Sequence, residues 1–254
     1  MEGCTFPFIF VHFNHLFSFM SIEVHQLSKT YGTQKAVDQI SFQAKPGEIV
    51  GFLGPNGAGK SSTMKMITGY LQADGGSINV CGMEVKTTSI DTKKKIGYLP
   101  ELNPLYPEMY VREYLKFIGG LHQIPDKIKR VEEVIQQTGL SAEANKQIHQ
   151  LSKGYKQRVG LAAAIIHDPE VLILDEPTSG LDPNQIIEIR NLIKSLGKDK
   201  TILFSSHILQ EVEAMCDRVI IIHKGNIVAD SSLKELKTSS AATNLEEFFR
   251  TLTT

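Results

Sequence analysis

Several features that would point to a particular compartment or partner are absent from this chain of 254 residues. Its three cysteines, Cys4, Cys81 and Cys216, are too widely spaced for a disulfide framework or a metal site, which favours a reducing cytosol. The formal net charge of -1 gives no indication of nucleic-acid binding. No apolar run reaches the roughly 20 residues that span a bilayer. The sequence therefore predicts a soluble chain that reaches a membrane only through a partner.

The first 19 residues differ in composition from the rest of the chain. They hold half of the 12 phenylalanines and no Lys or Arg, so the positively charged start of a signal peptide is missing. An ordinary strand pattern begins at Met20. We interpret Met20 as the natural start and residues 1–19 as a non-native or disordered extension. A membrane-surface anchor is the alternative, and N-terminal sequencing of protein from the native host distinguishes the two.

The remaining chain shows two kinds of hydrophobic pattern. Short alternating runs over residues 20–50 predict an antiparallel β layer. Apolar runs of the kind buried in parallel sheets are expected at Ile49–Leu53, Val171–Leu174 and Thr201–Ser205. Helical periodicity dominates residues 102–167, which predicts a helical subdomain inserted into an α/β core. Further predicted elements are helices at Ser61–Tyr70, Val111–Leu121, Lys127–Thr138, Ser152–His167 and Pro183–Leu196, strands at Ser77–Val80 and Ile96–Leu99 around a turn at Gly82, and a hairpin from Arg218–His223 to Ile227–Ala229.

A glycine-rich loop follows the first buried strand and precedes a predicted helix. Its sequence matches the phosphate-loop pattern G-x-x-x-x-G-K-[ST] in full, and strand and helix supply the expected context. Backbone N–H groups and the helix N-terminus would bind the phosphates, with Lys60 on the β- and γ-phosphates and Ser61 on Mg²⁺. The residues expected around the nucleotide are Gly54, Pro55, Asn56, Gly57, Ala58, Gly59, Lys60, Ser61 and Ser62. The predicted fold is thus an α/β P-loop NTPase with a mixed or parallel core sheet.

Two carboxylates end the second buried strand. Residues at the carboxyl end of a parallel strand face the ligand crevice of an α/β sheet. Asp175 is therefore expected to hold Mg²⁺, and Glu176 to act as the general base that activates the attacking water. A solvated acidic turn is the simpler alternative, but it is improbable beside a phosphate loop.

Together with Leu151-Ser-Lys-Gly-Tyr155, these motifs resemble the nucleotide-binding subunit of ATP-binding cassette (ABC) transporters over about residues 20–230. The resemblance is strongest to single-cassette exporter ATPases of multidrug and gliding-motility type. It implies a head-to-tail homodimer in which Ser152 and Gly154 of one chain bind the γ-phosphate of ATP held by the other. The usual family signature is Leu-Ser-Gly-Gly-Gln, so Lys153 and Tyr155 are departures.

The same resemblance assigns roles to four further residues. Tyr31 would stack on adenine, although a buried core tyrosine is the favoured interpretation of this residue alone. Asp182, in the Ser179–Asp182 loop, would link the two sites across the dimer. His207 would contact the γ-phosphate and orient the catalytic glutamate. Glu101 stands where the family usually has a glutamine, and its carboxylate would bind Mg²⁺ and depend on that metal more than an amide does.

The resemblance also implies what the ATPase would drive. A separate transmembrane permease would dock near Glu101, where Leu105, Tyr106, Met109 and Tyr110 form either a partner groove or ordinary core packing. The chain would lie on the cytoplasmic face of the membrane, with residues 20–230 as the ATPase domain and 231–254 as a helical tail. A translation- or repair-associated cassette ATPase is the alternative, but such proteins usually carry two cassettes or a large insertion.

Overall fold

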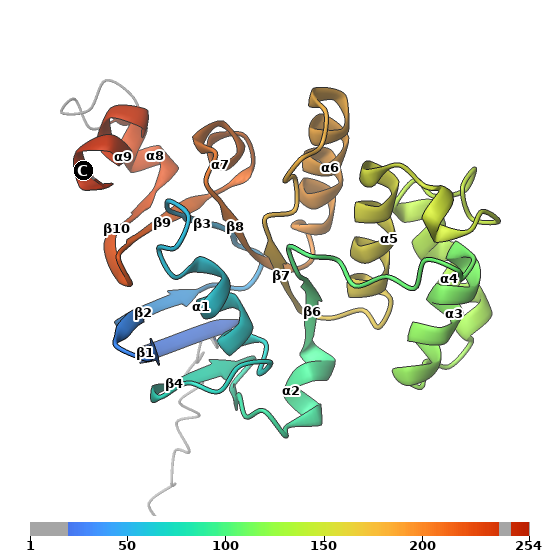
Figure 1. Ribbon diagram of the computed structural model, residues 1–254, viewed down its shortest axis with the longest axis horizontal. Coiled ribbons are helices and arrows are strands. Elements are labelled where there is room, and N and C mark those ends of the chain that lie inside the picture. Colours follow the sequence, from blue (N-terminus) through green and yellow to red (C-terminus); the bar gives the residue numbers. More distant parts are fainter. Residues whose placement is uncertain (1–19, 239–244, 254) are drawn as a thin grey trace, which may run out of the picture.

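The computed structural model describes residues 20–238 and 245–253 of the chain (Figure 1). Residues 1–19, interpreted above as a non-native or disordered extension, lie outside the described residues. The described residues form two β-sheets and a set of helices, and the larger sheet runs through the middle of the molecule. Helices α3, α4 and α5 lie on one side and the C-terminal helices on the other (Figure 1).

The smaller sheet is antiparallel and has the strand order β2-β1-β4-β5. Its first strands come from the region where alternating runs predict a β layer, and that prediction is confirmed. The pairing of β1 with β2 is irregular in three places, where the register shifts. The strands are β1 (Ile22–Tyr31), β2 (Gln34–Ala44), β4 (Gly75–Val80) and β5 (Met83–Glu84).

The larger sheet has the strand order β10-β9-β3-β8-β7-β6, in which every neighbouring pair except β9 and β10 is parallel. Strands β3, β7 and β8 lie inside this sheet, and every one of their residues is buried. Burial on both faces of the sheet explains why the sequences of these strands are continuous apolar runs. The strands are β3 (Ile49–Leu53), β6 (Ile96–Leu99), β7 (Val171–Asp175), β8 (Thr201–Ser206), β9 (Arg218–His223) and β10 (Asn226–Ser232).

The helices connect the strands and cover the sheets. Helix α6 begins at Pro183, whose fixed φ suits the first helical position, and Asp182 caps it. The helices are α1 (Lys60–Ile67), α2 (Ile90–Lys95), α3 (Val111–Leu121), α4 (Lys127–Gln137), α5 (Lys153–Ile165), α6 (Pro183–Leu196), α7 (Leu209–Met215), α8 (Leu233–Thr238) and α9 (Leu245–Thr253), with a short 3₁₀ turn at Ile148–Gln150.

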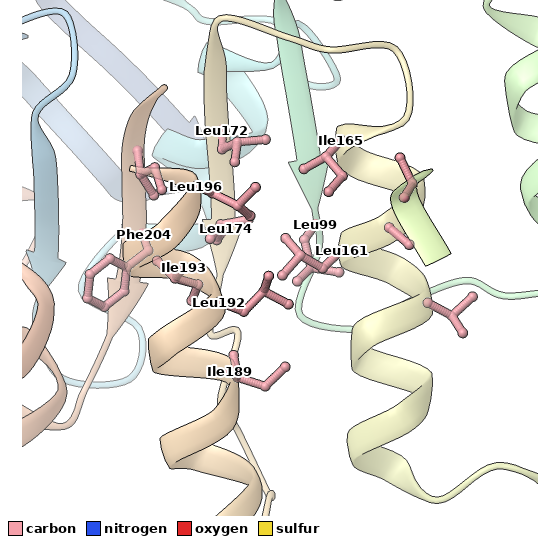
Figure 2. Close-up of a cluster of buried hydrophobic side chains, with 14 of the residues drawn as sticks. Leu99, Leu161, Ile165, Leu172, Leu174, Ile189, Leu192, Ile193, Leu196 and Phe204 are labelled. Atoms are coloured by element: carbon pink, nitrogen blue, oxygen red, sulfur yellow. The ribbon is translucent and has the colours of Figure 1, made fainter. Parts of the chain in front are cut away.

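Side chains of the central strands alternate between two hydrophobic clusters. In β7, Val171 and Ile173 pack with α1 and the small sheet, whereas Leu172 and Leu174 face the opposite side. On that opposite side, apolar residues of α5 and α6 meet the sheet (Figure 2). The residues labelled there are Leu99, Leu161, Ile165, Leu172, Leu174, Ile189, Leu192, Ile193, Leu196 and Phe204.

The structure corrects three expectations. Strand β4 pairs across the Gly82 turn with the two-residue strand β5, whereas the segment at Ile96 belongs to the other sheet. Helix α1 ends at Ile67, three residues early, because the chain turns at Gly69, where φ is +66°. Helices α2 and α7 are short and were not predicted, since their apolar periodicity covers fewer than two turns, whereas α8 lies within the stretch predicted as a helical tail.

The boundaries at 20–230 and 231–254 and the helical subdomain at about 102–167 stay predictions, although α3, α4 and α5 fall within that stretch. Within the described residues, no helix has the length and apolar character needed to cross a membrane.

Candidate functional site: a phosphate loop facing a buried carboxylate

The phosphate loop connects β3 to α1, as the sequence predicts. Two of its glycines are required by close contacts, because a Cβ atom on Gly54 would lie 2.4 Å from the Ile222 carbonyl oxygen and one on Gly59 would lie 2.4 Å from that of Ala36. Gly59 also has φ +111°, a conformation that L-residues rarely adopt. The loop is thus held tightly against neighbouring strands, with the N-terminus of α1 directed at the site.

Lys60 is buried at the centre of the site and has three neighbours. Its Nζ donates hydrogen bonds to the carbonyl oxygens of Gly54, at 2.7 Å, and Pro55, at 3.2 Å. The same atom lies 3.4 Å from Glu176 Oε1, and both side chains are less than a tenth exposed. The ammonium group therefore lies between the phosphate loop and the strand-end carboxylate.

Asp175 brings two hydroxyl groups together at the end of β7. Ser61 Oγ, on α1, donates to Asp175 Oδ1 at 3.1 Å, and Ser205 Oγ, on β8, donates to the same oxygen at 2.6 Å. Asp175 is 1% exposed. The structure thus joins two of the three residues that the sequence proposes as Mg²⁺ ligands, Ser61 and Asp175, although they lie far apart in the chain.

Glu176 is positioned by its backbone as well as by its side chain. Its φ of +49° lies in the left-handed region, where a non-glycine residue is uncommon, and its backbone N–H donates to Ser205 Oγ at 2.9 Å. Glu176 Oε2 lies 2.9 Å from His207 Nδ1, whose N–H donates to it. The carboxylate is consequently held between Lys60 and His207.

Lys60, Ser61, Glu176 and His207 line a cleft of about 480 Å³. Among the predicted site residues of the phosphate loop and of β7, Gly54, Pro55, Ala58 and Asp175 do not line it, and Asp175 contacts its wall through Ser61. Tyr31 lies at its rim and is 49% exposed, so a buried core tyrosine is excluded as the interpretation of this residue. Lys29 Nζ lies 5.8 Å from the Tyr31 ring centroid. Glu101 lines the same cleft. The lining residues are Tyr31, Gln34, Ala36, Asn56, Gly57, Gly59, Lys60, Ser61, Ser62, Glu101, Glu176, Ser179 and His207.

The three side chains predicted to bind Mg²⁺, those of Ser61, Asp175 and Glu101, all offer oxygen atoms as ligands. Ser61 and Asp175 touch each other, and Glu101 lines the same space. Mg²⁺ prefers such ligands and usually completes its octahedron with substrate phosphates and water. In residues 20–238 and 245–253 there is no cluster of three or more His, Cys, Asp or Glu side chains arranged as a metal site by themselves. The residues present therefore fit a Mg²⁺ ion that arrives with a nucleotide.

Ser152, Gly154 and Asp182 lie apart from this cleft. Ser152 Oγ caps α5 by accepting from the backbone N–H of Tyr155 at 3.4 Å, and Asp182 Oδ1 caps α6 by accepting from that of Gln185 at 3.0 Å. A Cβ atom on Gly154 would lie 2.5 Å from Gln185, so the two helix starts pack together. The structure thus places the signature beside the Asp182 loop of its own chain rather than beside its own phosphate loop.

Sequence reasoning missed several residues around the site. Ser205 contacts both Asp175 and Glu176, and its position at the end of an apolar strand beside them was a usable signal. Gln34 and Ala36 reach the cleft from β2, which no motif indicates. Glu211, Thr178 and Ser206 form a buried polar cluster behind the site that depends on contacts between separate elements.

Fold and site together define the chain as a P-loop ATPase in which a parallel sheet carries the phosphate loop and the strand-end carboxylates. Comparison with known proteins identifies the family of P-loop ATPases to which the chain belongs. Residues 37–179 match the family model described as ABC transporter. The chain therefore belongs to the ABC transporter family, as an ATP-binding subunit and an ATPase.

Relatives with assigned names agree on this family. The chain is 41% identical over 221 residues to the bacitracin transport ATP-binding protein BcrA of Bacillus licheniformis, covering 85% of this chain and 71% of that protein. It is 38% identical to the linearmycin resistance ATP-binding protein LnrL of Bacillus subtilis, with 85% and 70% covered. It is 35% identical to the Nod factor export ATP-binding protein I of Paraburkholderia xenovorans, with 90% and 76% covered.

Solved structures give the same answer for the fold. One, described as the structure of the ATP-binding subunit of an ABC transporter, superposes with a TM-score of 0.81 at 29% identity and covers 91% of this chain and 98% of that one. The cbiO1 protein of Clostridium perfringens, described as part of the ABC transporter complex cbiONQ, superposes with a TM-score of 0.78 at 28% identity, with 92% and 94% covered.

Proposed function

We propose that this chain binds ATP with Mg²⁺ between two copies of itself and hydrolyses it to drive export through a separate transmembrane permease. The observation that carries the proposal is the position of Glu176, which lies within hydrogen-bond or ion-pair distance of both Lys60 and His207. The relatives named for bacitracin transport, linearmycin resistance and Nod factor export support export as the direction.

The proposed chemistry follows from the positions of the chain's own groups. The loop N–H groups and Lys60 would bind the phosphates, while Ser61, Asp175 and Glu101 would hold Mg²⁺, whose charge would offset that of the phosphate oxygens. Glu176 accepts the proton of the attacking water, and the bond to the leaving phosphate oxygen breaks in line. The Nδ1–H of His207 orients that carboxylate, which leaves His207 Nε2 available to donate to the γ-phosphate when protonated.

The proposed dimer explains why Ser152 and Gly154 lie outside the cleft of their own chain. The N-terminus of α5 offers donors and a partial positive charge to a phosphate, and these suit the ATP held by a partner copy. Asp182 lies on the same face, next to the signature, and would contact the partner's site. Lys153 Nζ packs against Gly180, so the departure from the usual signature adds a cation at this face.

The permease is proposed to dock beside Glu101, and no nucleic acid is expected as a partner. Of the four residues suggested for this surface, Leu105 and Met109 pack against the core, whereas Tyr106 and Tyr110 are 52% and 49% exposed. A groove of about 410 Å³ is lined by Tyr98, Asn103 and His122 among others, but by none of these four residues. This docking would place the chain on the cytoplasmic face, held there by its partner alone. Copurification with membranes tests it, and a chain that stays free of membranes contradicts it.

The general-base assignment is tested by Glu176→Gln in the full chain. The amide keeps the size of the side chain but cannot take the proton, so we expect ATP binding with loss of turnover by about 100-fold or more. The variant should accumulate as an ATP-bound dimer in size-exclusion chromatography with Mg²⁺, whereas the unmodified chain returns to monomer as it hydrolyses. Normal hydrolysis by the variant would refute the role.

A further inference from the structure

A buried polar cluster lies directly behind the catalytic pair, and its centre is Glu211 on α7. The side chain is 1% exposed, yet it is a carboxylate, which is costly to bury unless it is paired and hydrogen-bonded. Both oxygens have partners: Thr178 Oγ1 donates to Oε1, and Ser206 Oγ donates to Oε2 at 2.6 Å. Arg190 Nη2, on α6, lies 3.9 Å from Oε1 and supplies the opposite charge.

The two hydroxyl partners come from the two segments that carry the catalytic side chains. Thr178 is two residues beyond Glu176, and Ser206 immediately precedes His207. Ser206 Oγ also accepts from the backbone N–H of Ile208 at 2.9 Å, so it holds the turn on both sides of His207. Thr178 and Ser206 are 2% and 0% exposed, which leaves water little access as a substitute partner.

The contacts form a closed ring. It runs from Glu176 along the chain to Thr178, through Glu211 to Ser206, along the chain to His207, and back to Glu176 through the bond of 2.9 Å. A loop fixed at both ends in this way has less freedom than one held by a single contact. Glu211 thus adds a buried link between the Glu176 loop and the His207 turn, beyond the pairing of β7 with β8 and the contact of Ser205 with the Glu176 backbone.

We propose that Glu211 is a positioning residue for ATP hydrolysis, bracing the Glu176 loop and the His207 turn so that their side chains meet. The proposal rests on the catalytic roles of Glu176 and His207 proposed above. Arg190 extends the brace to α6, whose N-terminus is capped by Asp182. The face proposed to meet the partner copy and the hydrolytic pair are therefore connected through one ion pair, between the buried Glu211 and the partly exposed Arg190.

The test removes each hydroxyl contact to Glu211 in turn, by substitutions at residues that are not proposed to contact ATP. Thr178→Val removes the hydroxyl and keeps the shape of the side chain, and Ser206→Ala removes the other donor. Thr178→Ser restores a hydroxyl at the same place. We expect kcat to fall about tenfold or more in the two cut variants, because misplacement of a catalytic group by about 1 Å can cost a hundredfold. KM for ATP should stay within about twofold, since the phosphate loop is untouched.

Two comparisons separate positioning from general loss of stability. Thr138→Val removes another fully buried threonine hydroxyl, one that donates to the Val134 carbonyl oxygen within the helical region. This control should lower the melting temperature and leave kcat unchanged. Thr178→Ser should recover most of kcat. The double variant Thr178→Val with Ser206→Ala should lose little more than either single variant, because one broken arm already frees the pair.

The proposal is overturned if Thr178→Val and Ser206→Ala keep the kcat of the unmodified chain, or if they change kcat and KM only as the Thr138 control does. Glu176→Gln and His207→Ala are measured alongside them. If those two variants also hydrolyse ATP normally, the catalytic roles fail. If those two are inactive while the cut variants turn over at full rate, the roles stand and the brace alone fails.

Discussion

Glu176 has a left-handed backbone, a bond from Ser205 to its N–H, and contacts from its carboxylate to Lys60 and His207. The buried ion pair with Lys60 has a consequence for stability, because removing one partner leaves the other charge buried without compensation. At this residue, therefore, variants made to study catalysis also change the free energy of unfolding, and the two effects must be separated.

Lys60→Ala is expected to destabilise the nucleotide-free chain as well as to abolish ATP binding. Loss of one partner of a buried pair costs about 3 kcal/mol or more, and Lys60 also donates to two loop carbonyl oxygens. Adding Glu176→Gln removes the stranded charge and should recover part of the loss. Chemical denaturation without nucleotide measures both variants. Equal stability of the single and double variants would show that the Lys60–Glu176 contact has no net effect.

Glu101 lines the cleft, at a position where the resemblance set out in the sequence analysis implies a glutamine. A carboxylate attracts Mg²⁺ but repels a γ-phosphate that the metal does not shield, whereas an amide does neither strongly. We expect Glu101→Gln to keep measurable ATPase activity and to need more Mg²⁺ for half-maximal rate. Titration of the rate with Mg²⁺ at saturating ATP measures the shift. Complete loss of turnover contradicts this expectation.

At the scale of elements, two histidines stack where α3 and α5 meet the sheet. The rings of His122 and His167 lie 3.9 Å apart and 6° from parallel, and His167 Nε2 donates to the Ile96 carbonyl oxygen at 3.0 Å. Burial, aided by the neighbouring His122, lowers the pKa of His167 to about 4. Burial also lowers the pKa of His122. Both rings are therefore neutral in the folded chain at pH 7.

The lowered pKa values make stability depend on pH in a defined direction. Between pH 6.5 and about 4 the unfolded chain binds protons that the folded chain rejects, so stability is greatest above pH 6.5 and is lost as pH falls toward 4. The contribution of His167 is at most about 3 kcal/mol. His167→Asn should flatten this slope in melting experiments across that range, whereas His25→Asn, at an exposed position, should not. An unchanged slope in His167→Asn would contradict the assignment.

The elements also show which parts of a fold can be predicted from a sequence. Strand β7 was predictable because its apolar run is continuous and ends at two acidic residues. Helix α7 was not, because it is short and only Glu211, Val212 and Met215 are buried. The phosphate loop and the carboxylates were predicted together since each is a local pattern. The ring through Glu211 joins residues about 30 positions apart, and no local pattern encodes it.

At the scale of the whole molecule, the proposed dimer makes each site depend on two chains. Mixing two inactive variants tests this directly. Lys60→Ala disables the phosphate loop of its own chain, and Ser152→Asp places a negative charge at the proposed phosphate contact while keeping a residue that caps α5 well. In a mixed dimer one site carries both defects and the other carries neither.

We expect each variant alone to be inactive and an equal mixture to regain ATPase activity. Coexpression with two different affinity tags, followed by tandem purification, isolates the mixed dimer for the measurement. If Ser152 served the ATP of its own chain, each site of the mixed dimer would keep one defect and mixing would restore nothing. A mixture of Lys60→Ala with Glu176→Gln is the matched control. Each of these defects acts on the ATP bound by its own chain, so each site of that mixed dimer keeps one defect and mixing should restore no activity.

The backbone of Glu176 carries a consequence for anyone who tries to make this protein more robust. A left-handed conformation costs an L-residue about 1–2 kcal/mol, and glycine or asparagine adopts it more easily. Glycine and asparagine at position 176 remove the carboxylate, and aspartate, which also tolerates this conformation, withdraws it by one methylene. Selection for heat resistance alone would thus reward chains that no longer turn over ATP. Improvement of this protein has to be selected on activity and stability together, since at this residue the two oppose each other.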